Sequence, residues 1–177
     1  MNNKKIIIGF IIFTLLMLGG GVFVLSSTTS GPGKITASQN AKAEVLEKTF
    51  DWGNIPINGG NATKTFIIKN TGSEILKLTG IKTSCTCTKA QVEIEGKTSP
   101  YFSMHATSGW VGEVAPGKEA RLLVIFDPAF HGPTGVGSVE RLISIQTNDS
   151  QNPNLEFSLK GVVIKDQYWQ KRFLYGW

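Results

Sequence analysis

The residues most suited to chemistry are two cysteines separated by one residue, in Ser84-Cys85-Thr86-Cys87-Thr88. The chain has no other cysteine, so this pair cannot join distant strands as most structural disulfides do. Four roles remain open: a local bridge, two free thiols, a pair of metal ligands, or a packing signature of the fold. On an extended strand both side chains would lie on one face, roughly 6.5–7 Å apart. A bridge would then need a bent backbone, which Thr86 resists more than glycine would.

A metal site would need further ligands beside the two thiolates. Two thiolates suit a soft ion such as Cu(I) or Zn(II), but two ligands are too few. Met104 and His105 lie together in a long connection and are the expected additional ligands beside Cys85 and Cys87. The other histidine, His131, precedes a Gly-Pro turn and is expected to be a solvated loop residue. The predicted metal ligands are therefore Cys85, Cys87, His105 and Met104, with copper or zinc as the ion and no other cofactor.

Charge and motifs exclude several classes of function. Of the 18 basic residues, 16 follow Leu25 together with all 13 acidic residues, and the two signs are interspersed. No basic stripe follows the pattern of a phosphate backbone, so we expect no nucleic-acid partner. The sequence also lacks the zinc-protease helix motif, the hydrolase nucleophile elbow and the phosphate-binding loop. We therefore expect no enzymatic activity, no catalytic residue and no small-molecule substrate.

The first 25 residues predict a single N-terminal transmembrane helix. Residues 1–5 form a short positive head, and residues 6–25 carry no charge. About 20 apolar residues span a hydrocarbon core of roughly 30 Å, whereas the apolar part of a signal peptide has about 7–15. A cleaved signal peptide is the alternative, because a glycine triplet weakens the helix. With the head in the cytoplasm, the rest of this single-pass cell-membrane protein is expected to be periplasmic or extracellular.

Composition divides the remainder into a tether, one domain and a tail. Residues 26–42 are rich in Ser, Thr and Gly and should form a flexible tether. Residues 43–165 suffice for one hydrophobic core. The aromatic and basic tail, residues 166–177, has three open roles: folding back on the domain, lying at the membrane interface, or docking on a partner. Trp110 is either a plug of its own loop or an exposed binding aromatic. The residues expected to bind a partner are Trp110, Trp169, Tyr175 and Trp177.

Short alternating segments predict that the domain is all-β. Phe66 and Ile68 share one face of their segment, and Ile143 and Ile145 alternate in the same way. Turn sequences rich in Pro, Gly, Asn and Asp separate these segments, and Gly161 is expected to mark a bulge. No convincing amphipathic helix interrupts them. The pattern is typical of a β-sandwich of about seven strands, with a small barrel as the alternative.

Short motifs occur in a fixed order between about Lys48 and Lys165. They are Phe50–Ile55, Phe66–Gly72, Ser84–Thr88, Pro116–Lys118, Val124–Pro128, Gly132–Gly137, Gln146–Asn148 and Leu159–Val162. In this order they resemble the bacterial family called domain of unknown function 1573. The resemblance implies an exported or membrane-anchored Ig-like sandwich and little chemistry. Thr86 replaces that family's usual central glycine, and the connection from Gln91 to Val114 is longer than usual.

Together these patterns predict a membrane-anchored, exported Ig-like domain that is a structural or protein-interaction module of the bacterial cell envelope. Its partner is expected to be another envelope protein, bound through a sheet edge, the connection from Gln91 to Val114 or the aromatic tail. The alternative hypothesis is an envelope protein that uses Cys85 and Cys87 for thiol redox chemistry or copper binding.

Overall fold

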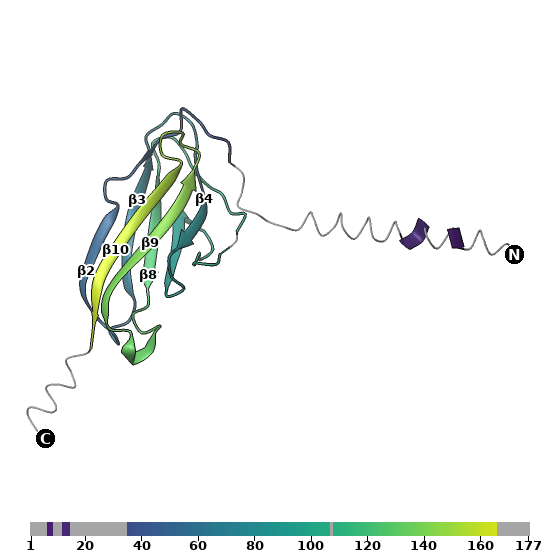
Figure 1. The fold of residues 1–177 in the computed structure, drawn as a ribbon. Helices are drawn as coiled ribbons and strands as arrows, with labels where there is room; N and C mark the ends of the chain where they lie inside the picture. Colours follow the sequence, from purple (N-terminus) through teal and green to yellow (C-terminus); the bar gives the residue numbers. More distant parts are fainter. Residues whose placement is uncertain (1–6, 9–11, 15–34, 107, 166–177) are drawn as a thin grey trace, which may run out of the picture. The chain divides into compact units, whose positions relative to one another are not determined.

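The computed structural model of the protein describes residues 7–8, 12–14, 35–106 and 108–165 (Figure 1). Within these residues, no helix has the length and apolar character needed to cross a membrane. The predicted anchor over residues 6–25 falls mostly outside the described residues and stays a prediction. The predicted tail, with Trp169, Tyr175 and Trp177, lies outside them entirely.

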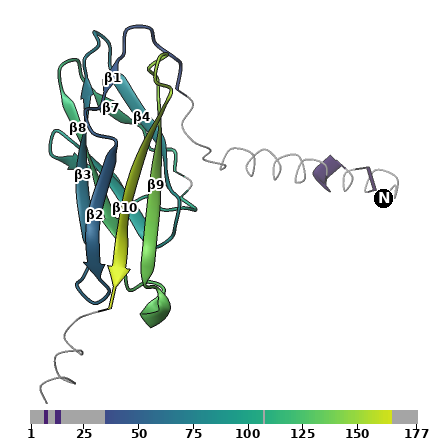
Figure 2. The same ribbon diagram turned by 60° about the vertical axis from the view of Figure 1, so that its left-hand side comes forward.

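The described strands form two five-stranded sheets that pack against each other (Figure 2). The first sheet has the order β1-β3-β8-β5-β6: β1 (Ala43–Glu44), β3 (Ala62–Asn70), β8 (Glu119–Phe126), β5 (Thr88–Ile94) and β6 (Lys97–Thr98). The second has the order β2-β10-β9-β4-β7: β2 (Thr49–Pro56), β10 (Asn154–Ile164), β9 (Gly137–Thr147), β4 (Leu76–Thr83) and β7 (Gly112–Val114). A single 3₁₀ turn, η1 (Gly132–Thr134), precedes β9. Neighbouring strands are antiparallel except β2 and β10, which are parallel.

The prediction of an all-β sandwich is confirmed, and the described part of the chain has ten strands where about seven were expected. The additional strands are β1, β6 and β7, with two, two and three residues. Each lies at an edge of a sheet. A segment this short shows no alternation of apolar and polar residues, which is why the sequence did not reveal it.

The core forms because the apolar residues of each strand point to the other sheet. Phe66 and Ile68 of β3 are buried, as are Ile143 and Ile145 of β9. The rings of Phe66 and Phe157 join the two sheets, with their centroids 4.9 Å apart. The expected sharing of faces along β3 and β9 is therefore confirmed, and it sets the register of both strands.

The irregularity predicted at Gly161 is present, but the extra residue belongs to β2 rather than to β10. The register between β2 and β10 shifts between Lys160 and Val162, where Trp52 and Gly53 of β2 lie opposite Gly161 alone, whereas the pairing of β10 with β9 is continuous. A side chain at Gly161 would lie 3.0 Å from the main-chain oxygen of Gly53, so the close approach of the two backbones requires glycine. Gly53 itself has a φ of 65°, which bends the edge strand β2 at the same point.

The two ends of the sandwich are formed by different turns. At one end the chain enters the domain, where the Ser38 main chain bridges to Asp149 in the turn between β9 and β10. At the other end β9 begins, β10 finishes, and the turn between β4 and β5 carries the two cysteines. The candidate site lies at this second end.

Candidate functional site

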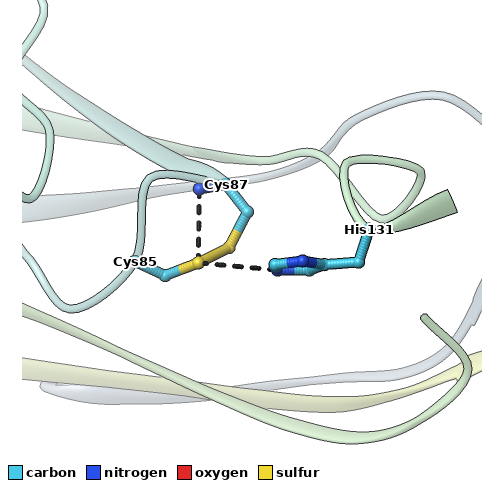
Figure 3. Close-up of side chains that lie close together, drawn as sticks. All are labelled: Cys85, Cys87 and His131. Atoms are coloured by element: carbon cyan, nitrogen blue, oxygen red, sulfur yellow. Dashed lines mark hydrogen bonds between the residues drawn. A yellow bond between two sulfur atoms is a disulfide. The ribbon is translucent and has the colours of Figure 1, made fainter.

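Cys85 and Cys87 are joined by a disulfide in the turn between β4 and β5 (Figure 3). Their Cα atoms are 5.2 Å apart, within the usual range for disulfides. The expectation that the pair lies on an extended strand is therefore wrong. The chain turns immediately after β4, which shortens the separation that an extended Cys-Thr-Cys segment would have, and Thr86 accommodates the turn.

Hydrogen bonds of two polar residues, Thr83 and Ser84, hold this turn. The Thr83 hydroxyl donates to the main-chain oxygens of Cys85 and Thr88, at 2.9 and 3.0 Å. The Ser84 N–H donates to the Leu142 carbonyl, and the Ser84 hydroxyl oxygen accepts from the Leu142 N–H, both at 2.9 Å. The two bonds of Ser84 thus fix the turn to Leu142 of β9, and the disulfide closes the turn internally.

The two sulfurs have different surroundings. Cys87 is buried, at 3% exposure, in an apolar cluster with Ile55, Phe126 and Val163. Cys85 is half-buried, and its sulfur accepts the N–H of Cys87 at 3.2 Å. Cys85 is therefore the sulfur that an incoming group can reach, and Cys87 is the one that the core retains.

His131, which was expected to be a solvated loop residue, is the third member of the cluster. Its Nε2 lies 3.9 Å from Cys85 Sγ, with the ring edge directed at the sulfur (Figure 3). The residue is exposed, as expected, but it is not isolated. In the described part of the chain, the two cysteine sulfurs and a ring nitrogen of His131 form a group of ligand atoms all within 4.8 Å of one another.

The loop that carries His131 is bonded directly to the cysteine turn. The Asp127 N–H donates to the Cys87 carbonyl at 3.0 Å, and the Asp127 carboxylate accepts the N–H of Ala129 at 2.9 Å. Gly132 then takes a φ of 69°, which favours glycine, and the chain turns into η1. The ring of Phe130 packs edge-on against the imidazole, with centroids 5.1 Å apart.

Met104 and His105, the predicted additional ligands, lie in the connection between β6 and β7. Both are exposed in a turn that follows the bridge between Phe102 and Ala90. His105 is not part of the described cluster of ligand atoms around the cysteines. His105 is the nearer histidine along the chain, whereas the fold brings His131, 46 residues from Cys85, to the sulfur.

One positive charge points into the sandwich at this end. Arg141 of β9 lies on the same face as Ile143, is half-buried and has a buried Nε without a hydrogen-bond partner among the described residues. Burial lowers the pKa of Arg141, because removal from water disfavours the charged form. Its terminal nitrogen donates to the Glu140 carbonyl at 2.8 Å.

Trp110, the described member of the predicted partner-binding set, packs under its own loop. Its ring is half-buried against Phe102, with centroids 5.6 Å apart. Its carbonyl accepts the Thr79 hydroxyl at 2.8 Å. A side chain at Gly112 would collide with the indole, so glycine makes room for it. Of the two roles expected for Trp110, the plug is visible in the structure.

The two facing sheets and their shared core define an Ig-like β-sandwich. The chain belongs to the HYDIN/CFA65/VesB-like Ig-like domain family, whose model matches residues 41–162. The Ig-like class agrees with what the sequence resemblance implied, and the matching model is that of this family rather than of domain of unknown function 1573.

None of the curated proteins matches the chain. Among solved structures, a protein of unknown function from Porphyromonas gingivalis W83 is 24% identical with a TM-score of 0.54, over 72% of this chain and 49% of that one. This chain therefore spans about half of that protein, and the likeness shows the fold alone. PapD-like domain 7 of human CEP192 is 16% identical with a TM-score of 0.45, over 75% and 92% of the two chains. The CooA pilin subunit of enterotoxigenic Escherichia coli is 13% identical with a TM-score of 0.41, over 72% and 99%.

Proposed function

We propose that the chain is a protein-interaction module of the bacterial cell envelope, anchored in the membrane by residues 6–25 with its Ig-like domain exported. The uncharged run of residues 6–25 supports the anchor. The ordered motifs that resemble domain of unknown function 1573 support export of the domain into the cell envelope. The domain would bind another envelope protein and would need no catalytic residue for this role.

The observation that carries the proposal is a hollow of about 250 Å³ beside Trp110. It lies where the edge strands β6 and β7 of the two sheets come to the same side of the sandwich. Its lining combines apolar, aromatic and charged side chains: Ile94, Glu95, Lys97, Thr98, Ser99, Trp110, Val111, Gly112 and Glu113. Aromatic residues in such settings are common anchors of protein interfaces.

We propose that this hollow receives an apolar side chain from an extended segment of the partner. The segment would run beside β7, whose outer edge is unpaired among the described strands. Main-chain hydrogen bonds along β7 would give affinity, and the hollow would select the side chain. The long connection from Gln91 to Val114 builds both parts of this surface.

A photo-reactive phenylalanine derivative at Thr98, in the full chain in its native membrane, tests the interface. Thr98 is exposed and lines the hollow, whereas Glu156 is exposed on the outer face of β10 and provides the matched control. We expect one discrete adduct from position 98, absent from position 156. The same adduct should form with the purified partner and be lost when Val111, which also lines the hollow, is replaced by arginine. Equal labelling from both positions would contradict the proposal.

Extraction of membranes with alkaline carbonate tests the anchor separately. The full chain should stay in the membrane pellet with residues 1–25 intact by mass spectrometry. Deletion of residues 1–25 should release it. A mature chain that begins after residue 25 would instead show a cleaved signal peptide.

A second candidate function, thiol–disulfide exchange, is favoured by the position of Cys85. An incoming protein thiolate would attack the accessible Cys85 sulfur, and Cys87 would leave as the thiolate within the core. Equilibration of the folded chain with mixtures of reduced and oxidised glutathione, followed by alkylation and mass spectrometry, measures whether the pair exchanges. A reversible transition in the folded protein supports this role. A pair that stays oxidised in every mixture contradicts it.

A further inference from the structure

We propose that reduction of the Cys85–Cys87 disulfide creates a site for one Cu(I) ion, with His131 as the third ligand. This site goes beyond the interaction function and does not depend on it. It shares its cysteines with the exchange reaction, but it concerns the reduced pair. A test that begins from chemically reduced protein therefore does not depend on whether the pair exchanges reversibly.

The positions of the three side chains support a common ion. Ligand atoms that lie about 2.0–2.3 Å from one ion are roughly 3.5–4 Å from each other. The Nε2 of His131 is already 3.9 Å from Cys85 Sγ. When the bond between the sulfurs is absent, the sulfurs move apart, and an ion can lie between them and the imidazole.

The surroundings hold the ligands in place before an ion arrives. The Asp127 N–H joins the His131 loop to the Cys87 carbonyl, and the Thr83 hydroxyl holds the cysteine turn. Neither contact involves a sulfur atom, so neither depends on the disulfide. Phe130 covers one edge of the imidazole. A site on fixed loops loses little conformational entropy when it binds an ion.

The ligand set selects the ion. Two thiolates and one imidazole are soft donors, which favour Cu(I) and Zn(II) over Mg(II) or Ca(II). Structural zinc takes four ligands in a tetrahedron, and the described cluster supplies three. No carboxylate belongs to the cluster. Cu(I) accepts three soft ligands, so it fits this set with no fourth residue.

A dithiol can reduce the Cys85–Cys87 disulfide before Cu(I) binds. The dithiol gives two electrons and two protons, the bond between the sulfurs breaks, and the donor becomes a disulfide. Cys85 and Cys87 are then thiols, and each loses its proton to water when Cu(I) binds. Oxidation of the pair would release the ion, so the disulfide and the copper site exclude each other.

Anaerobic titration of the full chain in detergent micelles tests the proposal. The chain is reduced with a phosphine, and Cu(I) is supplied in competition with the chromogenic chelator bicinchoninate. We expect one Cu(I) per reduced chain and none held by the oxidised chain. Loss of an outer-shell partner costs about 10–100-fold in metal affinity. His131→Ala, which removes a direct ligand, should therefore weaken binding by at least about tenfold.

His105→Ala is the matched control, because His105 is the other exposed histidine and lies outside the cluster. Its affinity for Cu(I) should equal that of the unmodified chain. Copper K-edge X-ray absorption should report two sulfurs and one nitrogen in the unmodified chain, and the nitrogen should be lost in His131→Ala. Circular dichroism checks that each reduced chain remains folded.

Four results would overturn the copper site. The first is a reduced, folded chain that binds no Cu(I). The second is equal affinity of His131→Ala and the unmodified chain. The third is binding by the oxidised chain as tight as by the reduced chain. The fourth is unfolding on reduction, since the site requires the folded loop. If the first result is found in a chain that still exchanges with glutathione, the exchange function stands without the copper site.

Discussion

The guanidinium carbon of Arg141 lies 5.0 Å from the ring centroid of Phe126. A cation thus covers the aromatic ring that packs beside Cys87 in the core. The attraction between a cation and a ring contributes about 0.5–1 kcal/mol at exposed sites. Arg141 also bears the cost of its buried Nε, which has no partner among the described residues.

Replacement of Arg141 by methionine should change the free energy of unfolding by less than about 1 kcal/mol. The substitution removes a desolvated charge, and the methionine side chain keeps the apolar packing. Arg141→Ala should cost about 1–2 kcal/mol, because it also removes the stem that covers Phe126. Urea unfolding measures both. Arg121→Met, at an exposed position of β8, is the control for loss of charge. A loss in Arg141→Met as large as that in Arg141→Ala would show that the charge itself stabilises the fold.

Asn70 is buried at 0% exposure and joins three backbone segments. Its Nδ2 donates to the carbonyls of Glu74 and Val114 at 2.8 Å each, and its Oδ1 accepts the Gly72 N–H at 3.0 Å. Asn70→Ala should cost about 2–4 kcal/mol, because it leaves buried backbone groups unpaired. Thermal and urea unfolding check the value. Asn61→Ala, at an exposed position, should change stability by less than about 0.5 kcal/mol.

The lowered pKa of Asp149 predicts how the free energy of unfolding changes in acid. Burial raises the pKa of Asp149, but hydrogen bonds from the Ala43 N–H, the Asn152 amide and the Gln151 N–H outweigh burial and leave it lowered. The unfolded value is about 3.9. A lowered folded pKa means that the carboxylate stabilises the fold above about pH 4, and that this contribution disappears as the pH falls through the folded pKa.

The stability difference between the unmodified chain and Asp149→Asn should therefore be full at neutral pH and shrink below about pH 4. Urea unfolding over a series of pH values measures it. Glu156→Gln, at an exposed position of β10, is the control. A difference that grows toward acid would contradict the direction given for the Asp149 pKa.

Reduction of the disulfide should cost little stability. The loop between Cys85 and Cys87 closes only three residues, for which the chain-entropy model gives about 1.6 kcal/mol. The hydrogen bonds of Thr83 and Ser84 remain in the reduced turn. Unfolding in urea with and without a phosphine reductant checks the value. Loss of a cooperative transition on reduction would show that the disulfide is required for the fold.

Alternation along the longer strands made much of the fold predictable. Phe66 and Ile68 predicted the inward face of β3, and Gly161 predicted where the register between β2 and β10 shifts. Among the segments that escaped prediction, β1, β6 and β7 are too short to show any period. Their positions depend on the strands beside them rather than on their own residues.

The candidate site was only half predictable. The spacing of Cys85 and Cys87 identified the pair, but the turn that brings their Cα atoms together depends on contacts with Leu142, far along the chain. His131 reaches Cys85 because the loop after β8 bonds to the cysteine turn, and no local pattern predicts such a contact. The Asp-Pro turn before His131 was the one signal that its loop is ordered, and it does not indicate what the loop faces.

The opposite placement of the chain entry and the cysteine pair sets a direction of approach. The β9 strand separates the two ends and spans 11 residues, roughly 35 Å. The turn at Asp149 and the loop of His131 therefore lie at opposite ends of the sandwich. A carrier of electrons or of copper would reach Cys85 and His131 only from the end of the sandwich away from Asp149.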